Sequence, residues 1–268
     1  MHVSELHIYP IKSCGGTAVT SAQLSKRGLQ ADRLLMLVDE EGVFITQREA
    51  PRLALVQPTL TPTATGHLLQ AVAPGMAELE VEVDDHGVRD TVVVWRDTCT
   101  GVDQGDVAAE WFGNYLGGGR VRLVRMANEF ARRLDPAYAI SPHDETSFTD
   151  GYPVLLISQG SLDDLNGRLQ VPLPMNRFRP NIVVTGCDAF AEDGWRRIRI
   201  GEVELALVKP CARCTVTTTD QATAVVGKEP LVTLATYRRV NNKVMFGQNL
   251  IGLGRGTMHV GDEITVLE

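Results

Sequence analysis

The chain has 268 residues, of which 44% are hydrophobic and 22% are charged, a balance that excludes wholesale disorder and suffices for one large domain or two small ones. Its 33 acidic and 26 basic residues give a net charge of -7. This charge argues against nucleic-acid binding, which depends on many cationic contacts with phosphates. Five cysteines are too few, and odd in number, for a disulfide-built secreted domain.

The N-terminus alternates apolar and polar residues and lacks the basic start and apolar run of a signal peptide. No segment approaches the run of about 20 apolar residues that a membrane helix needs. From these features we expect a cytoplasmic protein that does not contact a membrane. An anionic ligand would have to be held by a local cluster of basic side chains and backbone N–H groups.

Short strands dominate the elements that the sequence predicts. A hairpin is expected over 34–46, with Gly42 in its turn. Extended patterns predict strands at 6–11, 34–38, 43–46, 78–83, 91–95, 154–157, 181–185, 202–208, 215–219 and 264–267. Helical periodicity predicts helices at 106–116, 161–169 and 230–240. Many short strands with isolated helices favour a mainly β (α+β) fold of barrels or sandwiches, with a domain boundary between about 120 and 150.

The tetrapeptide Cys211-Ala212-Arg213-Cys214 is the most informative short motif. Such a pair can be half of a zinc site, a redox-active pair, one metal-binding thiolate with a neighbour, or two small residues at a sheet edge. A zinc site usually needs a second pair, and the chain has none. A redox pair usually opens a helix, whereas a predicted strand follows here. Arg213 and Lys209 add positive charge that favours the thiolate of Cys214, the form that binds soft metals.

Basic residues also cluster near two other predicted strand ends. Arg177 and Arg179 flank Phe178 immediately before the strand at 181–185, and guanidinium groups suit phosphate and carboxylate oxygens. Lys12 and Ser13 precede a Gly pair in a turn that suits a small anion. The alternatives are solvated arginines on a loop and an ordinary turn. No Gly-x-Ser-x-Gly motif of a serine hydrolase is present.

An ordered set of short motifs resembles a known family. The motifs are Tyr9-Pro10-Ile11-Lys12-Ser13, Asp32-Arg33, Asn176 to Asn181, Ala191 to Trp195, Ile200 to Val203, Lys209 to Cys214 and Phe246 to Asn249. Their order and spacing resemble MOSC proteins with an N-terminal MOSC β-barrel domain, in particular the amidoxime-reducing component and its bacterial relatives. The resemblance spans nearly the whole chain. It implies two packed β-barrel-like domains, an N-terminal barrel domain at 1–122 and a MOSC domain at 123–268.

The resemblance also implies a molybdenum cofactor, a pterin dithiolene that holds molybdenum. Cys214 would be the catalytic cysteine and the metal ligand. The resemblance assigns the binding of the cofactor to Lys12, Ser13, Arg33, Arg177, Arg179, Arg213 and Cys214. Residues 217–224 depart from the family pattern, because the Pro and Gly found there in many relatives are missing.

The implied reaction is the reduction of N-hydroxylated compounds such as amidoximes, hydroxylamines and N-hydroxylated bases. Electrons would come from a separate partner, a ferredoxin, a cytochrome b5-like protein or a flavin reductase, and the loop at 135–150 would contact the substrate. Two alternatives stay open. One is a non-redox carrier of the cofactor or of its sulfur, and the other is a zinc-stabilised β domain without catalysis.

Overall fold

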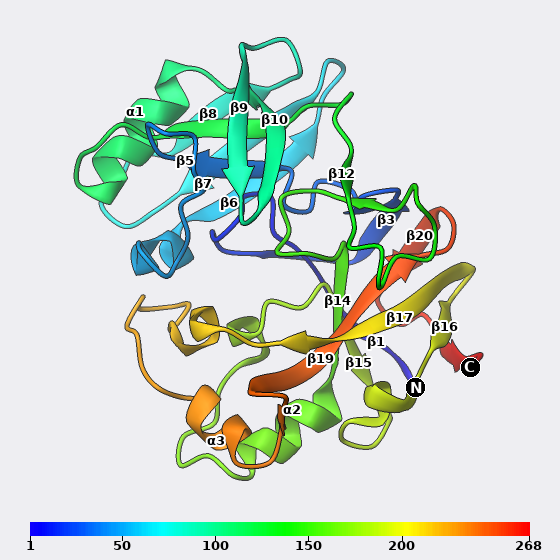
Figure 1. Cartoon of the computed structure of the whole chain (residues 1–268). Coiled ribbons are helices and arrows are strands. Elements are labelled where there is room, and N and C mark those ends of the chain that lie inside the picture. Colours follow the sequence, from blue (N-terminus) through cyan, green and yellow to red (C-terminus); the bar gives the residue numbers. More distant parts are fainter.

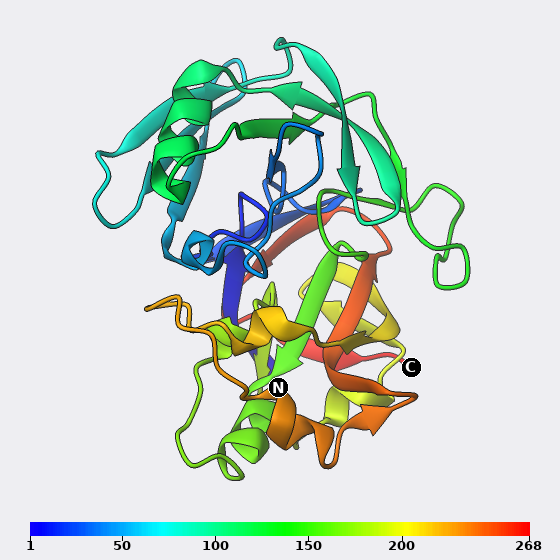
Figure 2. The same ribbon diagram turned by 60° about the vertical axis from the view of Figure 1, so that its left-hand side comes forward.

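Strands make up most of the regular structure, with three short α-helices between them, so the predicted mainly β (α+β) fold class is confirmed. The structure is a computed structural model that describes residues 1–268. Figure 1 shows two β-rich bodies, one above the other, and Figure 2 shows the same division from the side. We call them the upper body and the lower body.

The lower body is built on a nine-stranded sheet. Its strands run in the order β2-β1-β15-β14-β19-β17-β16-β21, with β18 paired to β19. The bounds are β1 His2–Ile8, β2 Thr17–Val19, β14 Val154–Ser158, β15 Ile182–Thr185, β16 Arg197–Ile200, β17 Val203–Ala212, β18 Arg239–Val240, β19 Lys243–Gly252 and β21 Ile264–Val266. A smaller sheet joins β20 (Gly256–His259), β3 (Ser21–Ser25) and β4 (Gly28–Leu29). Helices α2 (Gln159–Asn166) and α3 (Leu231–Ala235) bury Leu162, Leu165 and Leu234 in a cluster with Phe178 and Phe246.

The upper body combines two sheets and one helix. One sheet contains β5 (Leu35–Val38), β11 (Arg122–Met126), β10 (Asp97–Asp103) and β9 (Arg89–Val94), in that order. The other contains β6 (Gln57–Pro62), β7 (His67–Val72) and β8 (Leu79–Val83). Helix α1 (Asp106–Leu116) buries Trp111, Phe112 and Tyr115 and ends at Gly117, whose φ of 88° suits glycine. The alternation in β8, where Leu79 and Val83 are buried and Glu80 and Glu82 are exposed, matches a strand with one face on a core.

Strands β1 to β4, at the start of the chain, lie within the lower body, although its other strands come from the second half of the chain (Figure 1). Strand β1 pairs antiparallel with β15, and β3 pairs antiparallel with β20. Val3, Leu6 and Leu24 are buried in the same cluster as residues of β14, β15 and β17. The core of the lower body therefore depends on both ends of the chain. The sequence division at residue 122 stays a prediction.

Three predicted elements differ from the structure. The strand predicted at 215–219 is wrong, because Thr215–Thr218 form a short 3-10 helix, η4. Thr217 and Thr218 donate their hydroxyl hydrogens to the carbonyl oxygens of Cys214 and Thr215, and such local bonds compete with strand pairing. The helix predicted at 230–240 is α3 alone, followed by β18, and 43–46 forms only isolated bridges to β5 and β9.

Candidate functional site

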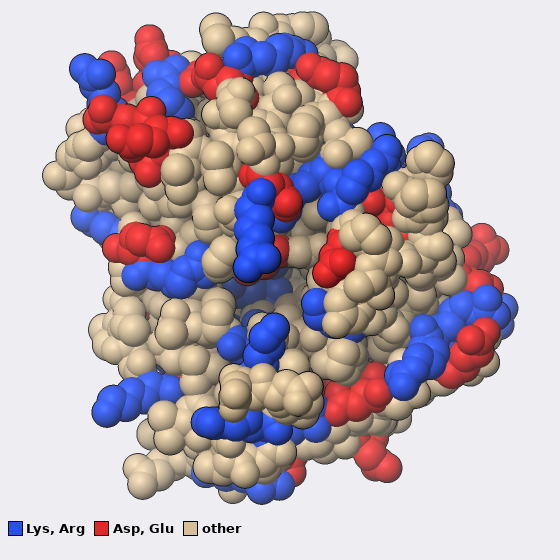
Figure 3. Space-filling view, in the orientation of Figure 1, with Lys and Arg blue, Asp and Glu red and all other residues tan.

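A cation-rich pocket opens between the two bodies, and residues of both bodies line it. Its charged lining consists of five cations, Lys12, Arg33, Arg48, Arg179 and Arg213, and one carboxylate, Asp150. Figure 3 shows Lys and Arg side chains around the hollow that separates the bodies. A chain with a net charge of -7 thus concentrates positive charge at one place.

The cations reach the pocket from the ends of separate strands. Lys12 and Ser13 follow β1, Arg33 precedes β5, Arg179 precedes β15, and Arg213 follows β17. Ser13, Arg33 and Arg179 have φ values of 69°, 45° and 56°, the left-handed region that costs a non-glycine residue roughly 1–2 kcal/mol. Left-handed residues of this kind cluster at functional sites, where the surrounding structure imposes the conformation. The backbone therefore tolerates strain to aim these side chains.

Tyr9 forms a platform beneath two of the arginines. The guanidinium carbons of Arg33 and Arg179 lie 4.1 and 4.3 Å from the centre of its ring. The Tyr9 hydroxyl donates a hydrogen bond to the carbonyl oxygen of Pro180 at 3.1 Å, and burial raises the pKa of Tyr9 to about 12. The ring is therefore a neutral, fixed surface that holds both guanidinium groups at one side of the pocket.

Arg179 carries a buried charge that no acidic residue neutralises. Its side chain is 9% exposed, and no residue accepts a hydrogen bond from its guanidinium group or forms an ion pair with it. Burial, and next the nearby charge of Arg33, lower the pKa of Arg179 to about 10, so it remains charged at neutral pH. A buried cation without a counter-ion is costly, and an anionic ligand in the pocket would supply the missing charge.

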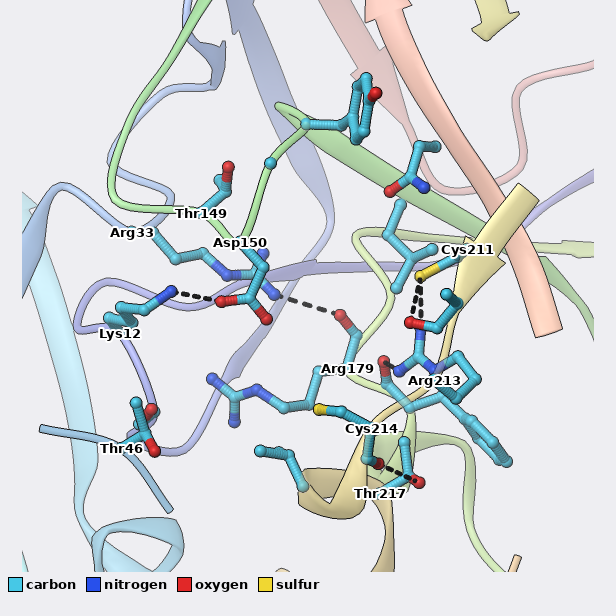
Figure 4. Close-up of a pocket in the computed structure, with 18 of the residues that line it drawn as sticks. Lys12, Arg33, Thr46, Thr149, Asp150, Arg179, Cys211, Arg213, Cys214 and Thr217 are labelled. Atoms are coloured by element: carbon cyan, nitrogen blue, oxygen red, sulfur yellow. Dashed lines mark hydrogen bonds and ion pairs between the residues drawn. The ribbon is translucent and has the colours of Figure 1, made fainter. Parts of the chain in front are cut away.

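The two cysteines of the Cys-x-x-Cys motif both line the pocket but differ in their surroundings (Figure 4). Cys214 is exposed, whereas Cys211 is half-buried and accepts a hydrogen bond from Nη1 of Arg213 at 3.0 Å. Arg213 thus contacts Cys211, not Cys214 as its position in the sequence suggests. Strand β17 is irregular between Leu207 and Lys209 and again between Pro210 and Ala212, immediately before Cys214. Irregularities of this kind re-aim side chains beside functional sites.

The other cysteines lie outside the pocket. Burial raises the pKa of the Cys14 thiol to about 12 and that of Cys99 to about 11. No group of three or more His, Cys, Asp or Glu side chains is arranged to hold a metal ion. Among the five thiols, that of Cys214 is the exposed one, and it lines the pocket.

The structure brings together six of the seven residues proposed from the sequence. Lys12, Ser13, Arg33, Arg179, Arg213 and Cys214 line the pocket. Arg177 does not, because its guanidinium group pairs with Asp220 at 3.0 Å outside the pocket.

Sequence reasoning missed Arg48, which lines the pocket, and Trp95, which lies at its edge. The indole N–H of Trp95 donates to Oδ1 of Asp150 at 3.1 Å, and the guanidinium carbon of Arg48 lies 4.5 Å from the Trp95 ring. Asp150 fell at the end of the loop expected to contact substrate. No local pattern marks Arg48 or Trp95, because only the packing of the two bodies brings them to the pocket.

Comparisons with known proteins match two segments of the chain to two domain families. Residues 1–118 match the MOSC N-terminal beta barrel domain, and residues 143–265 match the MOSC domain. The chain is 38% identical over 282 residues to "Mitochondrial amidoxime reducing component 2" of Rattus norvegicus, with 98% of this chain and 82% of the relative covered. It is 35% identical over 287 residues to "Mitochondrial amidoxime-reducing component 1" of Homo sapiens, with 99% and 82% covered.

Among solved structures, the YuaD protein from Bacillus subtilis is 12% identical with a TM-score of 0.44. The match covers 98% of this chain and 92% of the YuaD chain, but the structural likeness is too weak to add to the sequence relationship.

The relatives correct one expectation and establish the family. The expected cytoplasmic location is contradicted, because the similar curated proteins are named as mitochondrial. None of the helices combines the length and apolar character needed to cross a membrane. With both domains matched and more than 80% of each of these two relatives covered, the chain belongs to the family of MOSC proteins that carry an N-terminal MOSC β-barrel domain and include the amidoxime-reducing components.

Proposed function

We propose that this protein is a molybdenum-cofactor-dependent reductase of N-hydroxylated compounds that receives electrons from a separate redox partner. Amidoximes, hydroxylamines and N-hydroxylated bases are the proposed substrates. The relatives named as amidoxime-reducing components support the reaction class. The observation that carries the proposal is the pocket itself, which is lined by one exposed thiol, five cations and a single carboxylate.

The residues of the pocket fit a pterin cofactor with a phosphate group and a sulfur-bound metal. The buried and unpaired guanidinium group of Arg179 calls for an anion, and a phosphate group meets this need. Arg33 shares the Tyr9 platform with Arg179, and Lys12 and Ser13 come from the neighbouring turn. Cys214 offers a soft thiolate, the ligand type that suits a soft, sulfur-bound metal. These residues would hold the cofactor, with Cys214 as the metal ligand.

When bound, the molybdenum cofactor supplies the removal of oxygen from an N–O bond, a reduction that consumes two electrons and two protons per oxygen released as water. The cations that line the pocket would hold the cofactor, with the substrate bound in the same pocket. Arg213 donates to Cys211 and to the carbonyl oxygen of Phe178, and these two bonds fix its guanidinium group beside Cys211. The chain carries no motif for a flavin or an iron–sulfur cluster, so the proposal includes an external electron donor.

Turnover by the cofactor-loaded protein tests this proposal. Protein produced in a cofactor-competent host, supplied with an artificial reductant and benzamidoxime, is expected to form benzamidine. The measurement is chromatographic quantification of benzamidine per bound molybdenum. Bound molybdenum without turnover would refute the reductase and favour a non-redox carrier of the cofactor. Zinc in place of molybdenum would refute both.

A further inference from the structure

Asp150 is the one carboxylate in a pocket whose other charged residues are lysine and arginines. Its Oδ1 accepts hydrogen bonds from Nζ of Lys12 at 2.5 Å and from the indole N–H of Trp95 at 3.1 Å. No residue donates to Oδ2. Figure 4 shows one carboxylate oxygen directed at Lys12 and the other directed into the pocket. The pocket therefore contains one fixed carboxylate with a free oxygen.

Trp95 contributes to holding this carboxylate in place. It lies in the two-residue loop between β9 and β10, where its φ of 59° is unusual for a bulky side chain. The residue is 46% exposed, and the guanidinium group of Arg48 stacks over its ring. A strained and exposed Trp is unfavourable for folding alone, and its one side-chain hydrogen bond is to Asp150. The hairpin of the upper body thus holds a carboxylate of the segment that leads into β14.

Asp150 is ionised at physiological pH. The Asp150 side chain is 64% exposed. Desolvation by the pocket wall acts to raise its pKa, but the charge and hydrogen bond of Lys12 outweigh this effect and hold the pKa well below its usual range. An ionised carboxylate only accepts hydrogen bonds. The free Oδ2 therefore recognises a donor on the ligand, and a charged acceptor discriminates against ligands that lack this donor more strongly than a neutral acceptor does.

We propose that Oδ2 of Asp150 accepts a hydrogen bond from an N–H group next to the N–O bond of the substrate. This inference rests on the proposed reductase function and narrows its substrate class. Amidoximes, N-hydroxyguanidines and N-hydroxylated bases with an exocyclic amine carry such a donor. Tertiary amine N-oxides and simple ketoximes do not. Asp150 is the specificity-determining residue of the pocket, and Trp95 is its positioning residue.

The variant Asp150→Asn separates this role from a structural one. Lys12 and Trp95 both donate to the position of Oδ1, so the amide oxygen of Asn must occupy that position to keep these bonds. The amide nitrogen then replaces Oδ2 and presents a donor to the pocket. The substitution keeps the shape and the local contacts but reverses the hydrogen-bonding character at the proposed site. Thermal unfolding of each variant establishes that it is folded.

The measurement is calorimetric binding to cofactor-loaded protein without reductant, which separates affinity from turnover. The probes are benzamidoxime and N,N-dimethylbenzamidoxime, which lacks the N–H donor. We define the preference as the Kd of N,N-dimethylbenzamidoxime divided by the Kd of benzamidoxime. We expect this preference to be at least about tenfold larger for the wild type than for Asp150→Asn. The extra methyl groups affect both proteins, so their steric effect cancels when the two preferences are compared. Trp95→Phe keeps the ring and loses the N–H donor, so we expect a preference about threefold below that of the wild type.

Glu40→Gln is the matched control, because Glu40 is an exposed carboxylate outside the pocket. It is expected to keep the wild-type preference. Equal preference ratios in wild type and Asp150→Asn, or no binding of benzamidoxime to the wild type, would overturn the inference. If the wild type turns over substrate but Asp150→Asn keeps the wild-type preference, the inference about Asp150 is refuted and the proposed reductase function is not. Asp150-dependent binding without any turnover refutes the reductase and leaves the donor-recognition site standing.

Discussion

Some residues at the pocket have a charge or a backbone conformation that is unfavourable for folding alone. Arg179 combines a left-handed backbone, a buried guanidinium group and the absence of an acidic partner. Each of these features costs free energy in the protein without a ligand. Because all three features occur at Arg179, we infer that this arginine is present to bind the ligand and not to stabilise the fold.

Replacing Arg179 by Met is therefore expected to stabilise the cofactor-free protein while weakening cofactor binding. Exchanging a buried charge for an apolar side chain of similar length is worth on the order of 1–3 kcal/mol in the free energy of unfolding. Urea unfolding measures this gain, and elemental analysis measures the loss of molybdenum per chain. Arg199→Met, at an exposed position of β16, serves as the control with neither effect. A destabilised Arg179→Met protein with full molybdenum content would contradict this view of Arg179.

The sequence indicated much of the site at this scale, but not all of it. Lys12, Arg33 and Arg213 lie in short motifs at strand ends, and strand ends meet at pockets. Arg177 has the same local pattern as Arg179, and nothing in the sequence reveals that Asp220 pairs with it. Contacts such as this depend on packing between distant segments, which single-sequence patterns do not encode.

The helices, strands and turns around the site differ in how clearly the sequence predicts them. Helix α1 and strand β8 were predictable because their apolar residues follow one clear period. Helix η4 was not, because its β-branched residues favour a strand while their hydroxyl groups stabilise a turn. The turn after β1 shows another constraint, since Gly16 packs against the ring of Tyr9.

Gly16→Ala is expected to disturb the Tyr9 platform. A Cβ atom at residue 16 would lie 2.3 Å from a ring carbon of Tyr9, so the ring must move. Forcing an extra methyl group into packed structure costs roughly 1–3 kcal/mol, and the displaced ring would release Arg33 and Arg179. Thermal unfolding and molybdenum content are the two measurements. Gly194→Ala, where an added Cβ meets nothing within 4 Å, is the control. Unchanged stability and cofactor content in Gly16→Ala would show that the platform is dispensable.

The whole molecule brings together residues that lie far apart in the sequence. Strand β1 pairs with β15, although more than 170 residues separate their partners, as for Leu6 and Ile182. The pocket takes Lys12 and Arg33 from one end of the sequence and Arg179 and Arg213 from the other. Alternation and turn patterns predicted the strands, but they carry no information on such long-range pairing.

A fragment that begins at residue 123 is consequently expected not to fold alone. It lacks β1 and β3, and its main core loses Val3, Leu6, Ala22, Leu24 and Leu29. Circular dichroism and amide hydrogen exchange measure this, with the full chain as the reference. A cooperative, protected fragment would contradict the dependence of the lower body on the N-terminal strands.

The assignment of Cys214 as the metal ligand of a reductase is tested by comparing benzamidoxime reduction by Cys214→Ser and by the wild type, each normalised to folded protein. The control is Cys187→Ser, which removes a thiol outside the pocket. If Cys214 is the metal ligand, its variant loses at least about 100-fold in rate, more than is usual for residues that only support a ligand, while thermal unfolding stays cooperative. The control retains the wild-type rate. Full activity in folded Cys214→Ser would contradict the account.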